Sequence, residues 1–223
     1  MRVLTWNLFH GRSVPDTRHA LLPEFSAALA GWAWDVALLQ EVPPWWPGPL
    51  ASACDADARA VLTSRNLGLA ARRWVAERRP DLIKSNGGGA NAILVRTAFD
   101  GVARHASQRL RVLPERRWLH AVALRDAGVW VGNVHATANP KDKARADMVR
   151  CGEVLARWAG DAPALLGGDA NVPDPDVPGF TDLGGHRIDR FLARGAGLRP
   201  VAPPRVLDAG PLSDHAPVLI DVS

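Results

Sequence analysis

The chain has 223 residues, of which 27 are basic and 23 acidic, so its formal net charge is +4. This length fits one domain with a single core, and a hydrophobic share of 47% excludes a disordered chain. Two cysteines are too few for a disulfide framework or a cysteine-rich zinc site, and every apolar run is too short to span a membrane. We therefore expect one cytoplasmic domain over 1–223, with no stable membrane association and no implied protein partner.

Positive charge is concentrated in one segment, residues 59–117. This segment contains thirteen basic and four acidic residues, whereas the rest of the chain contains fourteen basic and nineteen acidic ones. Such segregation is typical of a surface that meets a polyanion such as nucleic acid. The preference for Arg over Lys also fits high-GC codon usage, but codon usage does not explain the uneven distribution.

Hydrophobic periodicity predicts a chain rich in strands. In chain order we expect a strand over 2–8, a helix over 19–34, a strand over 36–39, a helix over 50–62, strands over 90–95, 119–125 and 129–134, a helix over 141–158, and strands over 164–166, 188–192 and 218–222. The many strands and the hairpin connections favour an α/β protein with two packed sheets covered by helices over a purely parallel sheet.

Polar side chains recur where the predicted strands begin or end. The residues concerned are Asn7, Glu41, His135, Asp169, Asn171, Asp189, Asp214 and His215. One polar residue at a strand end is ordinary, since strands must meet solvent, and each of these residues also has a structural explanation of its own. Their repetition predicts a site assembled at one edge of a sheet core.

The residue types in this set restrict the chemistry. Oxygen donors from Glu41, Asp214 and Asn7 suit a hard cation such as Mg²⁺ or Mn²⁺, whereas zinc sites more often contain several His or Cys ligands. The sequence contains no GxxxxGK[ST] loop, no GxGxxG after a strand and no GxSxG elbow. An imidazole with carboxylate partners and a hard cation is suited to hydrolysis at phosphorus.

Six motifs occur in an order that characterises a known family. They are Thr5-Trp6-Asn7, Leu39-Gln40-Glu41, Asn133-Val134-His135, Gly167-Gly168-Asp169-Ala170-Asn171, Arg187-Ile188-Asp189 and Ser213-Asp214-His215. Through these motifs the sequence resembles the endonuclease/exonuclease/phosphatase superfamily, the metal-dependent phosphoesterases related to pancreatic deoxyribonuclease. The resemblance implies a four-layer α/β/β/α sandwich, in which two packed, mostly antiparallel mixed sheets are flanked by helices.

The same resemblance implies roles for individual residues. Glu41 would be the main metal ligand, with Asn7 and Asp214 completing the shell. The implied catalytic set is His135, Asp169, Asn171, Asp189 and His215. His215 would contact the scissile phosphate with Asp189 as its carboxylate partner, and Asp169 would align or deprotonate the attacking water. The motifs leave the identity of the general base open.

The sequence also departs from the better-known branches of that superfamily. The AP endonuclease branch usually has Tyr where this chain has His135, and the chain contains no Tyr. Relatives of pancreatic deoxyribonuclease pair this histidine with a Glu just before a central strand, where this chain offers Asn86 or Asn91 as substitutes. The signature of inositol polyphosphate phosphatases is absent too, so the motifs do not define the substrate.

Five further residues are candidates for substrate binding: Trp45, Trp46, Arg72, Arg73 and Arg145. The two tryptophans follow Glu41 closely and form either a stacking platform for bases or a buried anchor of the loop. The arginines either contact phosphates or belong to a solvated surface.

These observations predict an enzyme, a Mg²⁺- or Mn²⁺-dependent phosphodiesterase with nucleic acid as the favoured substrate, similar to an endonuclease or exonuclease. A phosphomonoesterase or phospholipase acting on a small phosphorylated head group is the alternative within the same class. A catalytically inactive nucleic-acid-binding module is the alternative from a different class. The presence of the complete motif set argues against it.

Overall fold

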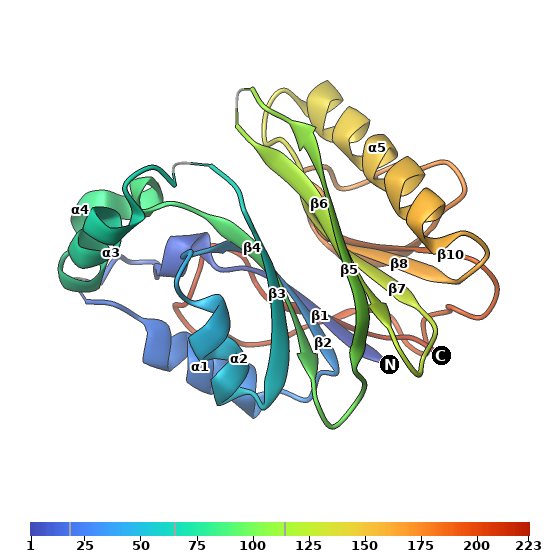
Figure 1. The fold of residues 1–223 in the computed structure, drawn as a ribbon, viewed down its shortest axis with the longest axis horizontal. Helices are drawn as coiled ribbons and strands as arrows, with labels where there is room; N and C mark the ends of the chain where they lie inside the picture. The colour runs from blue at the N-terminus through green and yellow to red at the C-terminus, as the bar shows by residue number, and fades with distance from the viewer. Residues whose placement is uncertain (18, 65, 114) are drawn as a thin grey trace.

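The computed structural model describes residues 1–17, 19–64, 66–113 and 115–223. These residues form two six-stranded sheets that pack together, with helices on their outer faces (Figure 1). The expected four-layer sandwich is thereby confirmed. Arg65, which belongs to the basic segment, lies outside the described residues.

The first sheet has the strand order β11-β12-β1-β2-β4-β3. Its strands are β1 (Arg2–Asn7), β2 (Val36–Val42), β3 (Ala56–Leu62), β4 (Ala90–Arg96), β11 (Arg205–Val206) and β12 (Val218–Asp221). β1 and β2 run parallel, with Asn7 opposite Gln40, whereas the other neighbours are antiparallel. The carboxyl ends of β1 and β2 therefore meet at one edge of the sheet.

The second sheet has the order β5-β6-β7-β8-β10-β9. Its strands are β5 (Val102–Arg111), β6 (Arg117–Leu124), β7 (Trp130–His135), β8 (Ala164–Asp169), β9 (Thr181–His186) and β10 (Asp189–Arg194). Here β7 and β8 are the parallel pair, and His135 lies opposite Asp169. Each sheet thus brings the carboxyl ends of a parallel strand pair to its edge.

Helices cover the outer face of each sheet, as Figure 1 shows. α1 (Leu22–Gly31) and α2 (Pro47–Ala53) lie against the first sheet, and α5 (Lys141–Ala159) lies against the second. α3 (Leu69–Arg78) and α4 (Pro80–Ile83) stand together at one end of the molecule. In α5 the fully or almost fully buried Ala144, Met148 and Cys151 recur at three- and four-residue steps, so one face of the helix packs on the sheet. Among the described residues, no helix is long and apolar enough to cross a membrane.

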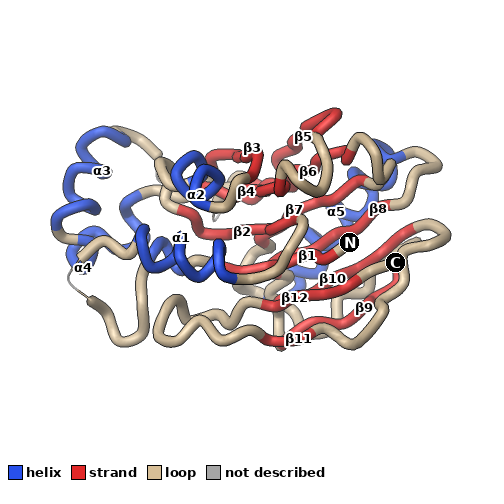
Figure 2. The backbone as a smooth tube through the Cα atoms, turned by 90° about the horizontal axis from the view of Figure 1, so that it is seen from below, coloured by secondary structure: helices blue, strands red, loops and turns tan. Residues whose placement is uncertain are grey.

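The core between the sheets follows from the alternation of side chains along each strand. On β2, Val36 and Leu38 face the second sheet, whereas Ala37 and Leu39 face the helices. Full burial of such aliphatic side chains contributes roughly 1.5–3 kcal/mol each. The two termini lie side by side (Figure 2), joined by a hydrogen bond of 2.7 Å from the Met1 amino group to the Val222 carbonyl oxygen.

The helix predicted over 50–62 is wrong in its second half. α2 ends at Ala53, and Ala56–Leu62 forms the edge strand β3. Alanine favours helices, but β3 pairs with β4 along its length, with Ala58 opposite Leu94, and this pairing overrides the local preference. The helix predicted over 19–34 is shorter than expected, and β5 and β9 are strands that the sequence pattern did not reveal.

Candidate functional site

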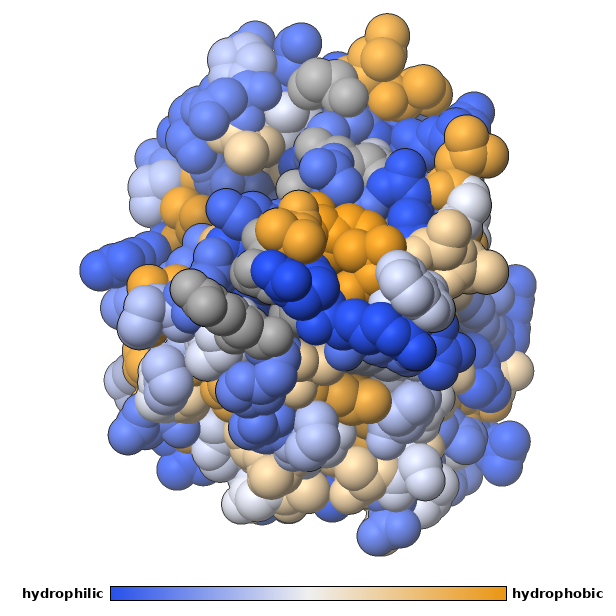
Figure 3. Space-filling view, turned by 90° about the vertical axis from the view of Figure 1, so that its left-hand side faces the viewer, coloured by the Kyte–Doolittle hydropathy of each residue, from blue (hydrophilic) through white to orange (hydrophobic). Residues whose placement is uncertain are grey.

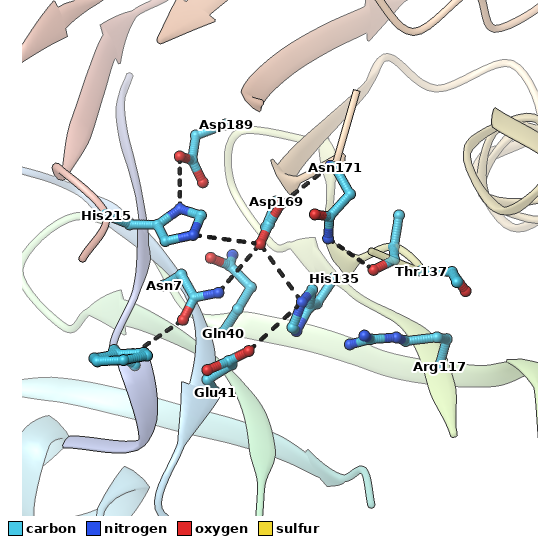
Figure 4. Close-up of polar contacts among 12 residues, drawn as sticks. Asn7, Gln40, Glu41, Arg117, His135, Thr137, Asp169, Asn171, Asp189 and His215 are labelled. Atoms are coloured by element: carbon cyan, nitrogen blue, oxygen red, sulfur yellow. Dashed lines mark hydrogen bonds and ion pairs between the residues drawn. The ribbon is translucent and has the colours of Figure 1, made fainter. Parts of the chain in front are cut away.

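The predicted site residues come from the strand ends described above. The side chains that meet there are Asn7, Glu41, His135, Asp169, Asn171, Asp189 and His215 (Figure 4). β1, β2, β7 and β8 contribute their carboxyl ends, while the antiparallel strand β10 contributes its first residue, Asp189. His215 lies on the loop before β12. Most of the predicted cluster therefore follows directly from the topology of the sheets.

A bulge in β2 turns Glu41 out of the sheet alternation. Leu39 pairs with Ala92 and Val42 with Ala90, so Gln40 and Glu41 together face a single residue of β4. Glu41 has a φ of 50°, a left-handed conformation that is uncommon outside glycine. As a result Gln40 is fully buried, whereas the Glu41 side chain keeps 23% of its surface exposed.

Gly168 brings Asp169 into place at the end of β8. Its φ is 139°, and a Cβ atom there would lie only 2.0 Å from the carbonyl oxygen of Val134 on β7. No side chain fits at that distance, so the close approach of β7 and β8 requires glycine. This approach sets His135 and Asp169 side by side.

Asp169 is buried at the centre of the cluster, with 2% exposure. Its Oδ2 lies 3.5 Å from His135 Nε2 and 3.9 Å from His215 Nε2. Burial, reinforced by the negative charge of Asp189, raises the pKa of Asp169 to about 7. A carboxyl group with such a pKa is suited to accept a proton near neutral pH.

His215 is the positively charged member of the cluster. Its Nδ1 lies 2.9 Å from Oδ2 of Asp189. Burial disfavours a charged imidazole, but this hydrogen bond and the negative charges of Asp189, Asp169 and Asp214 outweigh it and raise the pKa of His215 to about 9. The ring is therefore protonated at neutral pH and held by Asp189.

His135 is a neutral imidazole by contrast. Burial, followed by the positive charge of Arg117, lowers the pKa of His135 well below its usual value. Its Nε2 lies 3.8 Å from Oε1 of Glu41, whose Oε2 in turn lies 3.1 Å from Nε2 of His10. His10 belongs to the short turn directly after β1 and was not singled out from the sequence.

Two asparagines hold the central carboxylate. The side-chain amide of Asn7 donates a hydrogen bond of 3.1 Å to Oδ2 of Asp169. The backbone N–H of Asn171 donates one of 3.0 Å to Oδ1, and its side-chain amide donates to the Ala136 carbonyl oxygen. Both oxygens of Asp169 are thus oriented, which fixes the carboxylate relative to His135 and His215.

Arg117, at the start of β6, is a site residue that the sequence analysis missed. It lines a cleft of about 370 Å³ together with His10, Glu41 and His135. The side chain is largely buried, since the residue is 7% exposed. One terminal nitrogen donates a hydrogen bond of 2.7 Å to a carboxylate oxygen of Glu115, whereas Nε has no hydrogen-bond partner among the described residues. A buried guanidinium with an unused donor, beside two histidines and a carboxylate, is suited to bind an anion.

Besides the two tryptophans, four of the predicted residues lie outside the cluster. Asp214 is exposed on the loop before β12. Arg72 donates to the backbone oxygens of Leu67 and Asn86, which ties the start of α3 to the following segment. Arg73 pairs with Glu77 at 2.7 Å, and Arg145 pairs with Asp174 at 2.8 Å.

The two tryptophans after Glu41 have different environments. Trp46 is 4% exposed, and its ring centroid lies 5.4 Å from that of Phe25, so it anchors the loop in the core. Trp45 is half-buried and lines a second cavity next to the cleft.

Neither proposed substitute for a carboxylate partner of His135 bonds to it. Asn86 is exposed, whereas Asn91 is 1% exposed and both of its side-chain polar atoms are buried with no hydrogen-bond partner among the described residues.

The donor atoms of this site fit a hard divalent cation. Asp169, Asp189 and His215 present possible ligand atoms within 4.8 Å of one another. However, the hydrogen bond between His215 and Asp189 already occupies one nitrogen and one carboxylate oxygen of this group. Glu41 is the better candidate, because its carboxylate lies in the cleft and, within the described residues, its ion-pair partners are histidines rather than Lys or Arg.

The buried Asp169 lies against two imidazoles, and the adjoining cleft contains both a carboxylate, Glu41, and a guanidinium, Arg117. This combination of groups is suited to the hydrolysis of an anionic ester. The model of the endonuclease/exonuclease/phosphatase family matches residues 4–215. The chain belongs to this family, and it is accordingly a divalent-metal-dependent phosphoester hydrolase.

Solved structures share the fold over this whole chain. A conserved protein of unknown function from Enterococcus faecalis is 17% identical, with a TM-score of 0.74 and 99% of that chain covered. Humanized TDP2 from D. rerio is 17% identical, with a TM-score of 0.73 and 98% covered. A mannosyl-6-phosphatase from Bacteroides thetaiotaomicron is 15% identical, with a TM-score of 0.72 and 99% covered. No curated protein matches this chain.

Proposed function

We propose that this protein hydrolyses phosphodiester bonds, with nucleic acid as its substrate and Mg²⁺ or Mn²⁺ as its cation. The observation that carries the proposal is a continuous polar cluster: Arg117 and His135 line one cleft, His135 Nε2 lies 3.5 Å from the buried Asp169, and the protonated His215 lies on that carboxylate at 3.9 Å. A positive imidazole and a guanidinium suit a phosphate oxygen, while a carboxylate of raised pKa suits a water molecule.

Glu41, Asn7 and Asp214 would hold the cation. When bound, it would polarise a phosphate oxygen and stabilise the charge that develops in the transition state. Asp214 lies outside the cluster, but it adjoins His215 in the sequence and its negative charge helps to raise the pKa of His215, which supports its inclusion in this set.

The chain's own groups would then move the proton. Asp169 would accept a proton from the attacking water, since its oxygens are held by Asn7 and Asn171 and its pKa is raised to about 7. His215, kept cationic by Asp189, would hydrogen-bond to the phosphate and supply a proton to the leaving oxygen. His135 is neutral, and its Nε2 would donate to the phosphate if Nδ1 is the unprotonated nitrogen.

A nucleic acid is favoured because basic residues from the 59–117 segment reach the cleft. Arg116 and Arg117 both line it, beside Ser64 and Thr63. A phosphomonoester is the second candidate, supported by the likeness of the fold to that of a mannosyl-6-phosphatase. The intact pairing of His215 with Asp189 argues against an inactive binding module.

A substrate panel tests the proposal. It contains duplex DNA, single-stranded RNA, bis-p-nitrophenyl phosphate and mannose 6-phosphate, each with Mg²⁺ or Mn²⁺. We expect the diesters to be cleaved with kcat/KM at least tenfold above that of the monoester, and nucleic-acid affinity to fall steeply with salt. Cleavage of the monoester alone would replace the proposal by a phosphomonoesterase.

A further inference from the structure

A second cavity adjoins the catalytic cleft. It spans about 670 Å³, part of which is open to solvent, between α3, the loop after β2 and the turn before β4. Its walls include His10, Trp45, Ala76, Ile83 and Gly87. His10 also lines the cleft that contains Glu41 and His135, so the two cavities share a wall.

The inner wall of this cavity is apolar and converges on a small volume. A Cβ atom on Gly87 would lie 3.9 Å from both Trp45 Cη2 and Ala76 Cβ, and 3.8 Å from Ile83 Cγ2. Because Gly87 has no side chain, that volume is left open beside the edge of the indole. Figure 3 shows the end of the molecule that carries α3 and α4, where apolar side chains gather near the middle of the face and hydrophilic ones surround them.

Of the charged residues that line the cavity, Arg73 and Glu77 pair with each other, whereas Lys84 is exposed. Arg73 lies 2.7 Å from Glu77 on the next turn of α3, and both line the cavity. His10 Nδ1 lies 3.2 Å from the Gly88 carbonyl oxygen, while Nε2 faces Glu41. The cavity therefore differs from the cleft, where Arg117 has an unused donor, and it is better suited to an uncharged flat group than to a second phosphate.

We propose that this cavity binds an aromatic ring that the substrate carries on the phosphate hydrolysed in the cleft, with the ring against Trp45. The inference rests on the proposed function, because the cleft must hold that phosphate. The shared wall at His10 places the ring next to the reacting group. Aromatic contact and burial of this kind strengthen binding by about tenfold or more.

Binding of two phosphonates, which have no ester bond to hydrolyse, and of one nucleotide tests the inference. Phenylphosphonate, thymidine 5′-monophosphate and methylphosphonate are titrated against the Mg²⁺-loaded protein, and their Kd values are measured by NMR, with hydrolysis of the nucleotide monitored. We expect at least one aromatic ligand to bind about tenfold more tightly than methylphosphonate. Whether the nucleotide or the smaller aryl ligand binds better distinguishes a nucleobase from a simpler ring.

Two variants test whether the preference for aromatic ligands arises in this cavity. Ala76→Phe fills the cavity from α3, and Trp45→Leu removes the indole, so each should lower the aromatic-to-methyl affinity ratio about tenfold. Ala71→Phe is the matched control, because Ala71 is exposed on the same helix, and it should leave the ratio unchanged. If Ala76→Phe does not fold, Trp45→Leu decides the result.

Equal affinity for all three ligands would overturn the inference, as would a preference that survives in both cavity variants. Hydrolysis of bis-p-nitrophenyl phosphate is assayed separately. An active enzyme without aromatic preference contradicts only the cavity assignment, and an inactive protein with the preference contradicts only the proposed function.

Discussion

At the scale of single residues, the site is built on unequal ionisation of similar groups. His215 and His135 are both largely buried imidazoles, yet Asp189 raises the pKa of the first to about 9, whereas burial beside Arg117 lowers the pKa of the second. The difference arises chiefly from the hydrogen bond to Asp189, with the charges of Asp169 and Asp214 acting on His215 in the same direction. A protonated and a neutral ring can therefore face the same phosphate in different roles.

Asp189→Asn tests this arrangement. The amide keeps the shape of the side chain but removes the charge that keeps His215 protonated, so we expect kcat to fall about 10²- to 10⁴-fold with the fold intact. The control is Asp182→Asn on the adjacent strand β9, where the carboxylate pairs with Arg190 at the surface. Steady-state kinetics on a diester gives the result, and a variant with near wild-type kcat would remove the pair from the mechanism.

At the scale of elements, the close approach of β7 and β8 sets the geometry of the site. Gly168→Ala should lower the free energy of unfolding by about 3 kcal/mol or more, because its Cβ would overlap the Val134 carbonyl group. Gly128→Ala is the control, since Gly128 also has a positive φ, 63°, but a Cβ there would meet no atom within 4 Å. The free energy of unfolding of this variant should fall by only about 1–2 kcal/mol. Urea unfolding measures both, and equal losses would contradict the role of the close approach.

The strand ends that carry motifs were predictable, because an apolar run that stops at a polar residue is visible in the sequence. β3 was not, since Ala56–Leu62 is rich in alanine and becomes a strand only through its pairing with β4. Arg117 and His10 were missed for a related reason. The place of Arg117 beside Glu41 depends on the packing of the two sheets, and that of His10 on the pairing of β1 with β2 and the turn that follows β1, which no local pattern encodes.

At the scale of the whole molecule, a network of buried polar side chains connects the two sheets. The side-chain amide of Gln40 on β2 donates a hydrogen bond of 2.8 Å to Oδ1 of Asn133 on β7. Nδ2 of Asn133 in turn lies 3.2 Å from Nε2 of His120 on β6. His120 Nδ1 faces His105 of β5 at 3.4 Å. Burial, with a smaller contribution from His105, lowers the pKa of His120 to about 3, so the ring is neutral in the folded protein.

This network makes stability depend on pH. The folded pKa of His120 lies below its ordinary value of about 6.5, so the unfolded chain takes up the proton first as pH falls. Stability is therefore present above pH 6.5 and is lost between about pH 6.5 and 3. His120 alone should lower the unfolding free energy by about 2 kcal/mol from pH 7 to 5.

His105 faces His120, and burial together with the charge of Arg59 lowers the pKa of His105 too, so its titration adds to the same trend. Denaturant unfolding at pH 5 and 7 compares wild type with His120→Asn. The variant should show the smaller pH dependence, and an equal dependence would exclude His120 as its source.

The central claim is that a divalent cation at Glu41 supports phosphoester hydrolysis. The most direct measurement is the rate of bis-p-nitrophenyl phosphate hydrolysis by EDTA-treated enzyme during titration with Mg²⁺ or Mn²⁺. We predict that EDTA abolishes turnover, that either cation restores it, and that Glu41→Gln shifts the titration to higher metal concentration. Glu153→Gln, which alters an exposed carboxylate on α5, should behave as wild type. Turnover that persists in EDTA, or an unshifted titration in Glu41→Gln, would contradict the account.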